Sequence, residues 1–126
     1  MTFTKTPVNI LDAVTVGTSN FQTSDGIDLG AAFDFCIGYR MTFHGSATAG
    51  AEVRLYADPS GNSLDFTIGD HANHYDLSDI TISAGNIVDG VLLFQKAPLY
   101  VKARVYNLDA GQTITDCSLW SIVQAP

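Results

Sequence analysis

Glutamate is almost missing from this chain: of its 13 acidic residues, twelve are Asp and one, Glu52, is Glu. Glu suits helix interiors, whereas Asp favours turns and disfavours helices. No stretch of the sequence shows apolar residues at the 3.6-residue spacing of an amphipathic helix. The low Glu content and the lack of helical spacing together predict a chain of strands and turns.

Long apolar runs are also lacking. Runs such as Val91–Phe94 last a few residues, whereas a membrane-spanning helix needs roughly 20. The beginning, Met1–Lys5, lacks the basic start and continuous apolar stretch of a secretory signal. We therefore expect no membrane span, no export signal and a protein made in the cytoplasm.

Basic residues are few, because Lys and Arg number only 6 and the net charge is −7. Nucleic-acid affinity comes largely from clustered cations, so DNA and RNA are poor candidate partners. The two cysteines, Cys36 and Cys117, allow at most one bridge, and a domain of 126 residues does not depend on it. We expect two buried free thiols, and the sequence leaves their pairing open.

Motifs that carry catalysis are missing. The sequence has no Gly-x-Ser-x-Gly, no phosphate-binding Gly-rich loop before a helix and no His-Glu-x-x-His. Neither Cys36 nor Cys117 lies in a recognisable arrangement with a histidine base such as His44. With a single Glu, nothing selects a carboxylate pair for glycoside hydrolysis. We expect a protein that is not an enzyme and holds no cofactor.

Potential metal ligands gather only in Asp70–Asp76, which contains His71, His74 and Asp76. A His-x-x-His pair on a loop has no fixed geometry, so a polar surface loop is favoured over a metal-dependent hydrolase site. A calcium site fits no better, because the spacing of the oxygen-bearing residues matches no regular binding loop. Those residues, which ordinary turn chemistry explains, are Asp58, Asn62, Asp65 and Asp70.

Two-residue alternation is the strongest pattern that is present. Over Phe33–Phe43 the odd positions are mostly large and apolar, and the even positions are polar or small. Ala51–Ala57 and Leu99–Tyr106 alternate in the same way. Such alternation is typical of antiparallel strands with one face in a core.

Turn residues separate the strands. Asp58–Asn62 contains Pro and Gly and leads into Leu64–Ile68, which predicts a hairpin of that segment with Ala51–Ala57. A second turn is expected at Asn107–Gly111. Weaker strands are expected at Val8–Val16, Ile27–Leu29, Ile80–Ser83, Val91–Phe94 and Thr113–Val123.

The fold class that follows is all-β, an antiparallel β-sandwich or jelly-roll-like fold of eight or nine strands. Residues 8–126 are expected to form a single β-sandwich domain. Residues 1–7 suit an extended N-terminal arm that crosses onto a neighbour, and a plain frayed terminus is an equal alternative.

The polar sides of the predicted strands combine arginine with tyrosine. Both residue types are enriched at contact surfaces, so such a face is a candidate for docking a protein or stacking on a sugar. The alternative is that long polar side chains simply cover an exposed sheet. Trp120 is assigned to core or sheet packing, and His44 to the end of a strand. The candidate partner-binding residues are Arg54, Tyr56, Tyr100, Lys102, Arg104 and Tyr106.

Two segments carry a family resemblance. Thr48–Gly61, reading TAGAEVRLYADPSG, and Ala97–Asp109, reading APLYVKARVYNLD, resemble segments of small β-sandwich virion proteins of tailed bacteriophages. The long preceding strand Phe33–Phe43 fits the same pattern, and the resemblance spans roughly Ile27 to Trp120.

The resemblance implies a head decoration (cement) protein or a tail-associated protein. Such a protein is often a homotrimer and reinforces a shell by contacting the major capsid protein or other virion proteins. It carries over no catalytic or cofactor residues. The alternative is a carbohydrate-binding or tail-fibre-associated β-sandwich module, and the sequence does not decide between head and tail.

Overall fold

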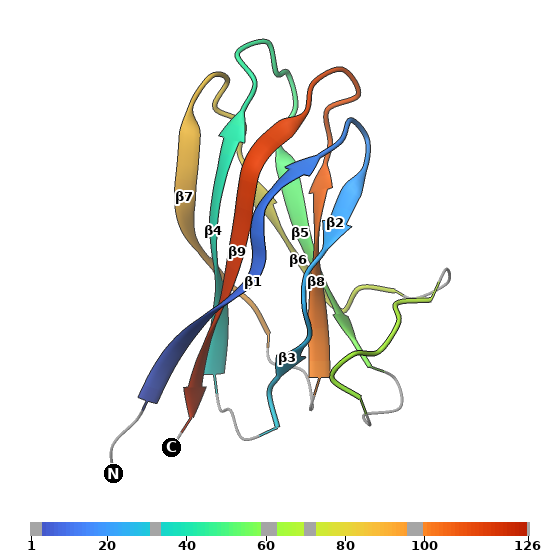
Figure 1. The fold of residues 1–126 in the computed structure, drawn as a ribbon, viewed down its shortest axis with the longest axis vertical. Helices are drawn as coiled ribbons and strands as arrows, with labels where there is room; N and C mark the ends of the chain where they lie inside the picture. The colour runs from blue at the N-terminus through green and yellow to red at the C-terminus, as the bar shows by residue number, and fades with distance from the viewer. Residues whose placement is uncertain (1–3, 31–33, 59–62, 70–72, 96–99, 126) are drawn as a thin grey trace.

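Two antiparallel sheets stacked face to face form the protein (Figure 1). The structure, a computed structural model, describes residues 4–30, 34–58, 63–69, 73–95 and 100–125. The four-stranded sheet, here the β4 sheet, has the order β1 (Thr4–Val16), β9 (Ile114–Ala125), β4 (Asp34–Phe43), β7 (Ile87–Leu93). The second sheet, here the β8 sheet, has the order β2 (Phe21–Thr23), β8 (Tyr100–Asn107), β5 (Ala51–Ala57), β6 (Asp76–Ile80), with β3 (Ile27–Asp28) also paired to β8. The predicted all-β sandwich of eight or nine strands is confirmed.

The core lies between the sheets and follows the two-residue alternation. On β4, Phe35, Ile37, Met41 and Phe43 are all at most 3% exposed. On β8 the inward side chains are equally buried, and the burial alternates strictly along Tyr100–Asn107. The alternating segments therefore place one side chain in two in the core, as the sequence predicts.

The predicted hairpin of Ala51–Ala57 with Leu64–Ile68 is wrong. The strand β5 pairs with β6 on one side and with β8 on the other, and residues 63–69 are not a strand. Phe66 is buried because it packs against Lys102 on the outward face of β8, with the ammonium 5.5 Å from the ring centroid. An apolar residue that covers a sheet from outside produces the same alternation as one that enters a core.

Three of the weaker strands lie near their expected positions, and one strand was missed. The strand expected at Ile80–Ser83 lies earlier, as β6, and the one expected at Val91–Phe94 begins earlier, as β7. The short strand β2 carries too few residues for an alternation to be visible.

Two polar side chains, one on the last residue of β8 and one just after it, join the loops at one end of the sandwich, at the top in Figure 1. The buried Asn107 amide donates to carbonyls of Val16, Gly17 and Gln112. The buried Asp109 carboxylate accepts backbone N–H groups from Thr48, Ala49, Gly111 and Gln112. The turn predicted at Asn107–Gly111 therefore links the β1–β2, β4–β5 and β8–β9 connections.

The strand β1 runs beside β9 from Thr4, which pairs with Ala125, so the described ends lie together at the bottom of Figure 1. Residues 4–7 of the expected arm are part of this pairing on the chain's own sheet, and residues 1–3 lie outside the described residues. Three register shifts interrupt the later part of the pair, where Ala13 and Asp116 have φ of 47° and 49°.

The two cysteines lie too far apart to form a bridge. In the sheet register Cys36 lies opposite Ile122, five residues along β9 from Cys117, which is about 17 Å of strand. A disulfide needs Cα atoms within about 7 Å.

Among the described residues no helix is long and apolar enough to cross a bilayer.

Candidate functional site

The six predicted partner-binding residues come together on the outward face of the β8 sheet. In the β5–β8 register Arg54 lies opposite Arg104, and Tyr56 lies opposite Lys102. Tyr56 is only 4% exposed and the other five are half-buried. Two adjacent strands therefore bring these side chains together, as alternation requires.

These side chains stack on one another. The Arg54 guanidinium carbon lies 4.1 Å from the Tyr106 ring centroid. The Arg104 guanidinium lies between two rings, 4.2 Å from Phe21 and 5.3 Å from Tyr56. The Tyr56 and Tyr106 hydroxyl oxygens are 2.8 Å apart. We call this group, Arg54, Tyr56, Arg104, Tyr106 and Phe21, the Arg/Tyr ladder.

The contacts within the ladder shift the pKa values of Arg54 and of its two tyrosines. Burial, followed by the hydrogen bond to Tyr106, raises the pKa of Tyr56. Burial acts in the same direction on Tyr106, but hydrogen bonds from Tyr56 and Arg104 lower the pKa of Tyr106 overall. The shared hydrogen bond therefore shifts the pKa values of the two hydroxyls in opposite directions. A hydrogen bond to Glu52 raises the pKa of Arg54.

The face that carries the ladder is balanced in charge. Its cations are Arg54, Lys102 and Arg104. Glu52, its register neighbour Asp79 on β6, and Asp28 beside Tyr100 place three carboxylates on the same face. The clustered arginines therefore do not make this face a site for a strongly anionic partner.

The tyrosines of the ladder offer little open ring surface. A sugar stacks on an exposed aromatic face, but Tyr56 is nearly covered and Arg54 already occupies one face of Tyr106. His74 packs edge-on against Tyr56 at 6.3 Å between centroids. The sequence analysis did not assign Phe21 or Phe66 to this face. Phe21 lies in a strand of only three residues, and Phe66 falls in Leu64–Ile68, whose alternation predicted a hairpin strand.

The predicted metal-ligand segment is described only in part. Asp70 and His71 lie outside the described residues. His74 contacts Tyr56, and the two Asp76 carboxylate oxygens accept the backbone N–H groups of Leu77 and Gln95. Within the described ranges no three His, Cys, Asp or Glu side chains gather as a metal site would require.

Two of the calcium candidates, Asp58 and Asp65, lie within the described residues. The Asp58 carboxylate accepts the Ser63 N–H at 3.0 Å, which is ordinary turn chemistry. Asn62 and Asp70 lie outside the described residues.

Cys117 is unsuited to nucleophilic chemistry. It is fully buried, and burial raises the pKa of its thiol to about 12. The thiol is therefore protonated at neutral pH, whereas the thiolate is the nucleophile.

His44 follows the last residue of β4, and its Nδ1 accepts the Ser46 N–H, which agrees with its predicted place at a strand end.

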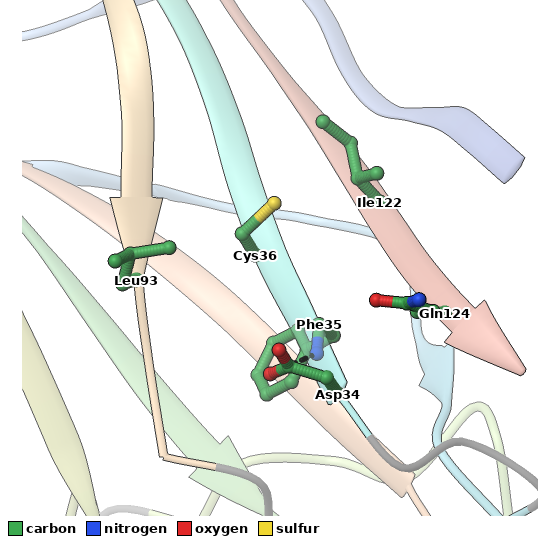
Figure 2. A pocket seen from close by; sticks show the side chains of 6 residues that line it. All are labelled: Asp34, Phe35, Cys36, Leu93, Ile122 and Gln124. Atoms are coloured by element: carbon green, nitrogen blue, oxygen red, sulfur yellow. Dashed lines mark hydrogen bonds between the residues drawn. The ribbon is translucent and has the colours of Figure 1, made fainter. Parts of the chain in front are cut away.

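A second surface, which the sequence reasoning missed, is the outward face of the β4 sheet. A hollow of about 130 Å³ lies on this face. Figure 2 shows the side chains from β4, β7 and β9 that line it. Trp120 lies further along β9, where it packs across Gly38 and lines a second open hollow. The first hollow is lined by Asp34, Phe35, Cys36, Leu93, Ile122 and Gln124.

This face is apolar toward its β7 side. Leu93 is 83% exposed, Ile87 58% and Val91 56%. Isolated exposed apolar residues are common, but neighbouring ones beside a hollow are typical of contact surfaces. The sequence pattern does not reveal this face. Both the inward and the outward positions of β7 are mostly apolar, so its outward side chains look like core residues in the sequence.

Comparison with known proteins gives the fold and no family. No family model and no curated protein match the sequence. Among solved structures, one described as infectious bursal virus derived T=1 particles matches with a TM-score of 0.55 and 11% identity, over 96% of this chain and 32% of that one. The structure of the Bacillus endospore appendages, described as disulfide-linked pili, matches with a TM-score of 0.50 and 9% identity, over 98% of this chain and 88% of that one.

A VP2 subviral particle of infectious bursal disease virus matches at a TM-score of 0.52 and 12% identity, over 96% of this chain and 33% of that one. The chain thus spans about a third of the length of the viral proteins it matches. At these identities the likeness shows the β-sandwich fold alone, and this architecture serves structural and binding proteins.

Proposed function

We propose that this chain is a non-enzymatic structural subunit of a virion, and specifically a decoration protein that binds and stabilises the assembled head of a tailed bacteriophage. The resemblance of Thr48–Gly61 and Ala97–Asp109 to phage virion proteins motivates the specific role. The shared fold with a viral particle and a pilus supports the coarser one. Under this proposal the protein is made in the host cytoplasm and resides on the virion. The resemblance also implies a homotrimer, and the sedimentation experiment described below distinguishes a trimer from a dimer.

The observation that carries the proposal is the apolar outward face of the β4 sheet. Leu93, which lines the hollow at Cys36 and Ile122, is exposed to water there, and so is Val91. Ile87 is exposed at the other end of β7, where it lines the second hollow. Covering a side chain such as Leu93, which is 83% exposed, would contribute roughly 1–2 kcal/mol. Many copies that each make a modest contact can stabilise a lattice together.

The Arg/Tyr ladder is the other candidate face. Its arginines are already stacked on rings, and its two tyrosine hydroxyls are hydrogen-bonded to each other. A partner would gain less there than on the β4 sheet, because the ladder groups have already found contacts within the chain. We therefore assign the shell contact to the β4 sheet. A carbohydrate-binding role is not favoured, since Phe21 is the one exposed ring of the ladder and Arg104 already lies over it.

Under this proposal the genome that encodes this chain also encodes a major capsid protein, and the test is binding to shells assembled from that protein. We expect co-sedimentation that saturates at a fixed number of copies per shell. Ile122→Asp, which places a charge in the hollow, should weaken binding at least about tenfold, equal to about 1.4 kcal/mol. Leu77→Asp is the matched control, since Leu77 is 41% exposed on the other sheet and should bind normally.

Lys102→Glu probes the second face in the same assay. Loss of binding in Lys102→Glu with normal binding in Ile122→Asp would move the contact to the β8 sheet. No binding of the unaltered chain to any such shell would count against decoration altogether.

A further inference from the structure

The edge of the β4 sheet formed by β7 is open along its whole length. In Figure 1 this strand is the outermost one, and its only partner strand among the described residues is β4. The β4–β7 register runs from Cys36–Leu93 to Thr42–Ile87 without a shift. An open, regular edge strand presents unpaired backbone groups to any other strand.

The other three edges each carry a feature that blocks strand pairing. The strand β1 contains Pro7 and three register shifts. The strand β2 has only three residues. The strand β6 has five residues and bears Asp76 and Asp79. Proline, bulges, short length and charge are the usual means by which proteins protect edges, and β7 has none of these except the single charge of Asp89.

The hydrogen-bond pattern shows which groups of β7 face outward from the edge. Phe43 donates its N–H to Asn86, which makes that pair a hydrogen-bonded one. Hydrogen-bonded and non-hydrogen-bonded pairs alternate along an antiparallel ladder. Val88, Gly90 and Leu92 therefore bond to β4, and the free N–H and C=O groups belong to Ile87, Asp89, Val91 and Leu93.

We propose that β7 pairs antiparallel with β7 of a second copy of this chain, about a two-fold axis at Gly90, joining two β4 sheets into one continuous sheet. In this register Ile87 lies opposite Leu93 of the second copy, and Asp89 lies opposite its Val91. All four of these residues carry free edge groups, so each such pair forms two hydrogen bonds. The strand is thus complementary to itself, as an isologous interface requires.

Charge and side-chain size determine the position along β7 at which the two-fold axis passes. A centre on Asp89 would set two carboxylates directly opposite each other, which is unfavourable. A centre on Gly90 sets two glycines at a non-hydrogen-bonded pair, where Cα atoms approach to about 4.5 Å. Each Asp89 also lies opposite Arg40 in its own chain, which offsets its charge. Gly90 has a separate role within the chain, because a Cβ there would lie 2.8 Å from the Tyr39 hydroxyl.

The size of the contact predicts weak pairing. Seven residues at about 3.4 Å give an edge of ~24 Å, and a sheet ~10 Å thick makes the contact roughly 500 Å² for both copies together. Stable interfaces bury about 1,200–2,000 Å². We therefore expect monomers in dilute solution and pairs at high local concentration, such as on a lattice. The inference does not depend on shell binding, because the chain alone is tested.

Sedimentation equilibrium from about 10 μM to 1 mM should show a monomer–dimer equilibrium with a dissociation constant weaker than ~10 μM. Val91→Pro is the sharpest variant, because it deletes an N–H that points to the free edge and leaves the β4 bonds intact. It should weaken dimerisation at least about tenfold. Val91→Asp should do the same if the proline variant does not fold, because it sets a carboxylate opposite Asp89 of the second copy. Leu77→Asp on β6 is the matched control.

Amide hydrogen exchange locates the contact. With rising concentration the N–H groups of Asp89, Val91 and Leu93 should exchange more slowly, whereas those of Val88 and Leu92 should change little. A chain that stays monomeric at 1 mM, a trimer instead of a dimer, or a dimer unaffected by both Val91 variants would each overturn the proposal. A failure to bind shells would leave it standing.

Discussion

Replacing Asn107 by alanine should destabilise the end of the sandwich where three loops meet. The side chain is buried, and its amide donates to Gln112 at 2.7 Å and to Val16 and Gly17 at 3.3 Å. Its Oδ1 accepts the Asp109 N–H at 3.0 Å. Alanine removes all four hydrogen bonds and leaves backbone groups from two connections without this partner.

The expected cost follows from these contacts. The two short hydrogen bonds contribute about 1 kcal/mol each, and the buried groups left unsatisfied add at least about 1 kcal/mol. We expect Asn107→Ala to lower the free energy of unfolding by roughly 3 kcal/mol. With a urea slope of about 2 kcal/mol/M, the unfolding midpoint falls by about 1.5 M.

The assay is equilibrium urea unfolding followed by the fluorescence of Trp120, the single tryptophan. Asn86→Ala is the matched control: that side chain is exposed and donates to Ser83, so its loss should cost less than about 0.5 kcal/mol. Equal midpoint shifts in the two variants would refute the reasoning, because they would show that burial and the linking of loops add nothing.

Three further outcomes are expected. Hydrogen bonds from backbone N–H groups, with Thr48 first and Gly111 next, hold the pKa of Asp109 at about 2, below its ordinary value of 3.8. Because the pKa is lower in the folded state, the stabilisation from this carboxylate is present above pH 4 and is lost as the pH falls toward 2. Between pH 5 and pH 2 the unfolding midpoint should therefore fall less in Asp109→Asn than in the unaltered chain. Cys117, with a thiol pKa of about 12, should react with iodoacetamide at pH 8 roughly a thousandfold more slowly in the native protein than in denaturant, and fast native labelling measured by mass spectrometry would contradict its burial. Gly50→Ala should destabilise by more than about 2 kcal/mol, because its Cβ would lie 2.3 Å from the Ile80 carbonyl oxygen, whereas Gly45→Ala meets no atom within 4 Å and should change thermal stability little.

The fold was accessible from the sequence where alternation reflects a core. Phe35, Ile37, Met41 and Phe43 repeat every second residue, and the structure buries all four. Alternation misleads where a residue packs on a sheet from outside. Phe66 is buried against β8 without belonging to a strand, so the pattern of Leu64–Ile68 predicted a hairpin that does not form.

The candidate site was predicted in part for a related reason. The residues of the Arg/Tyr ladder on β5 and β8 were found because polar residues at one parity of two clear strands must share a face. Their stacking was not predictable, since Phe21 comes from a strand of three residues. The apolar face of the β4 sheet was hidden because Val91 and Leu93 look like core residues until the strand order places β7 at an edge.

The pairing of Thr4 with Ala125 has a mechanical consequence. The two ends leave neighbouring antiparallel strands at the same corner, and the hydrogen bonds between those strands run across the direction of the strands. Tension applied through both ends would therefore load the bonds one after another and peel β1 from β9. A subunit built in this way resists force well only when the force enters through the broad faces of its sheets.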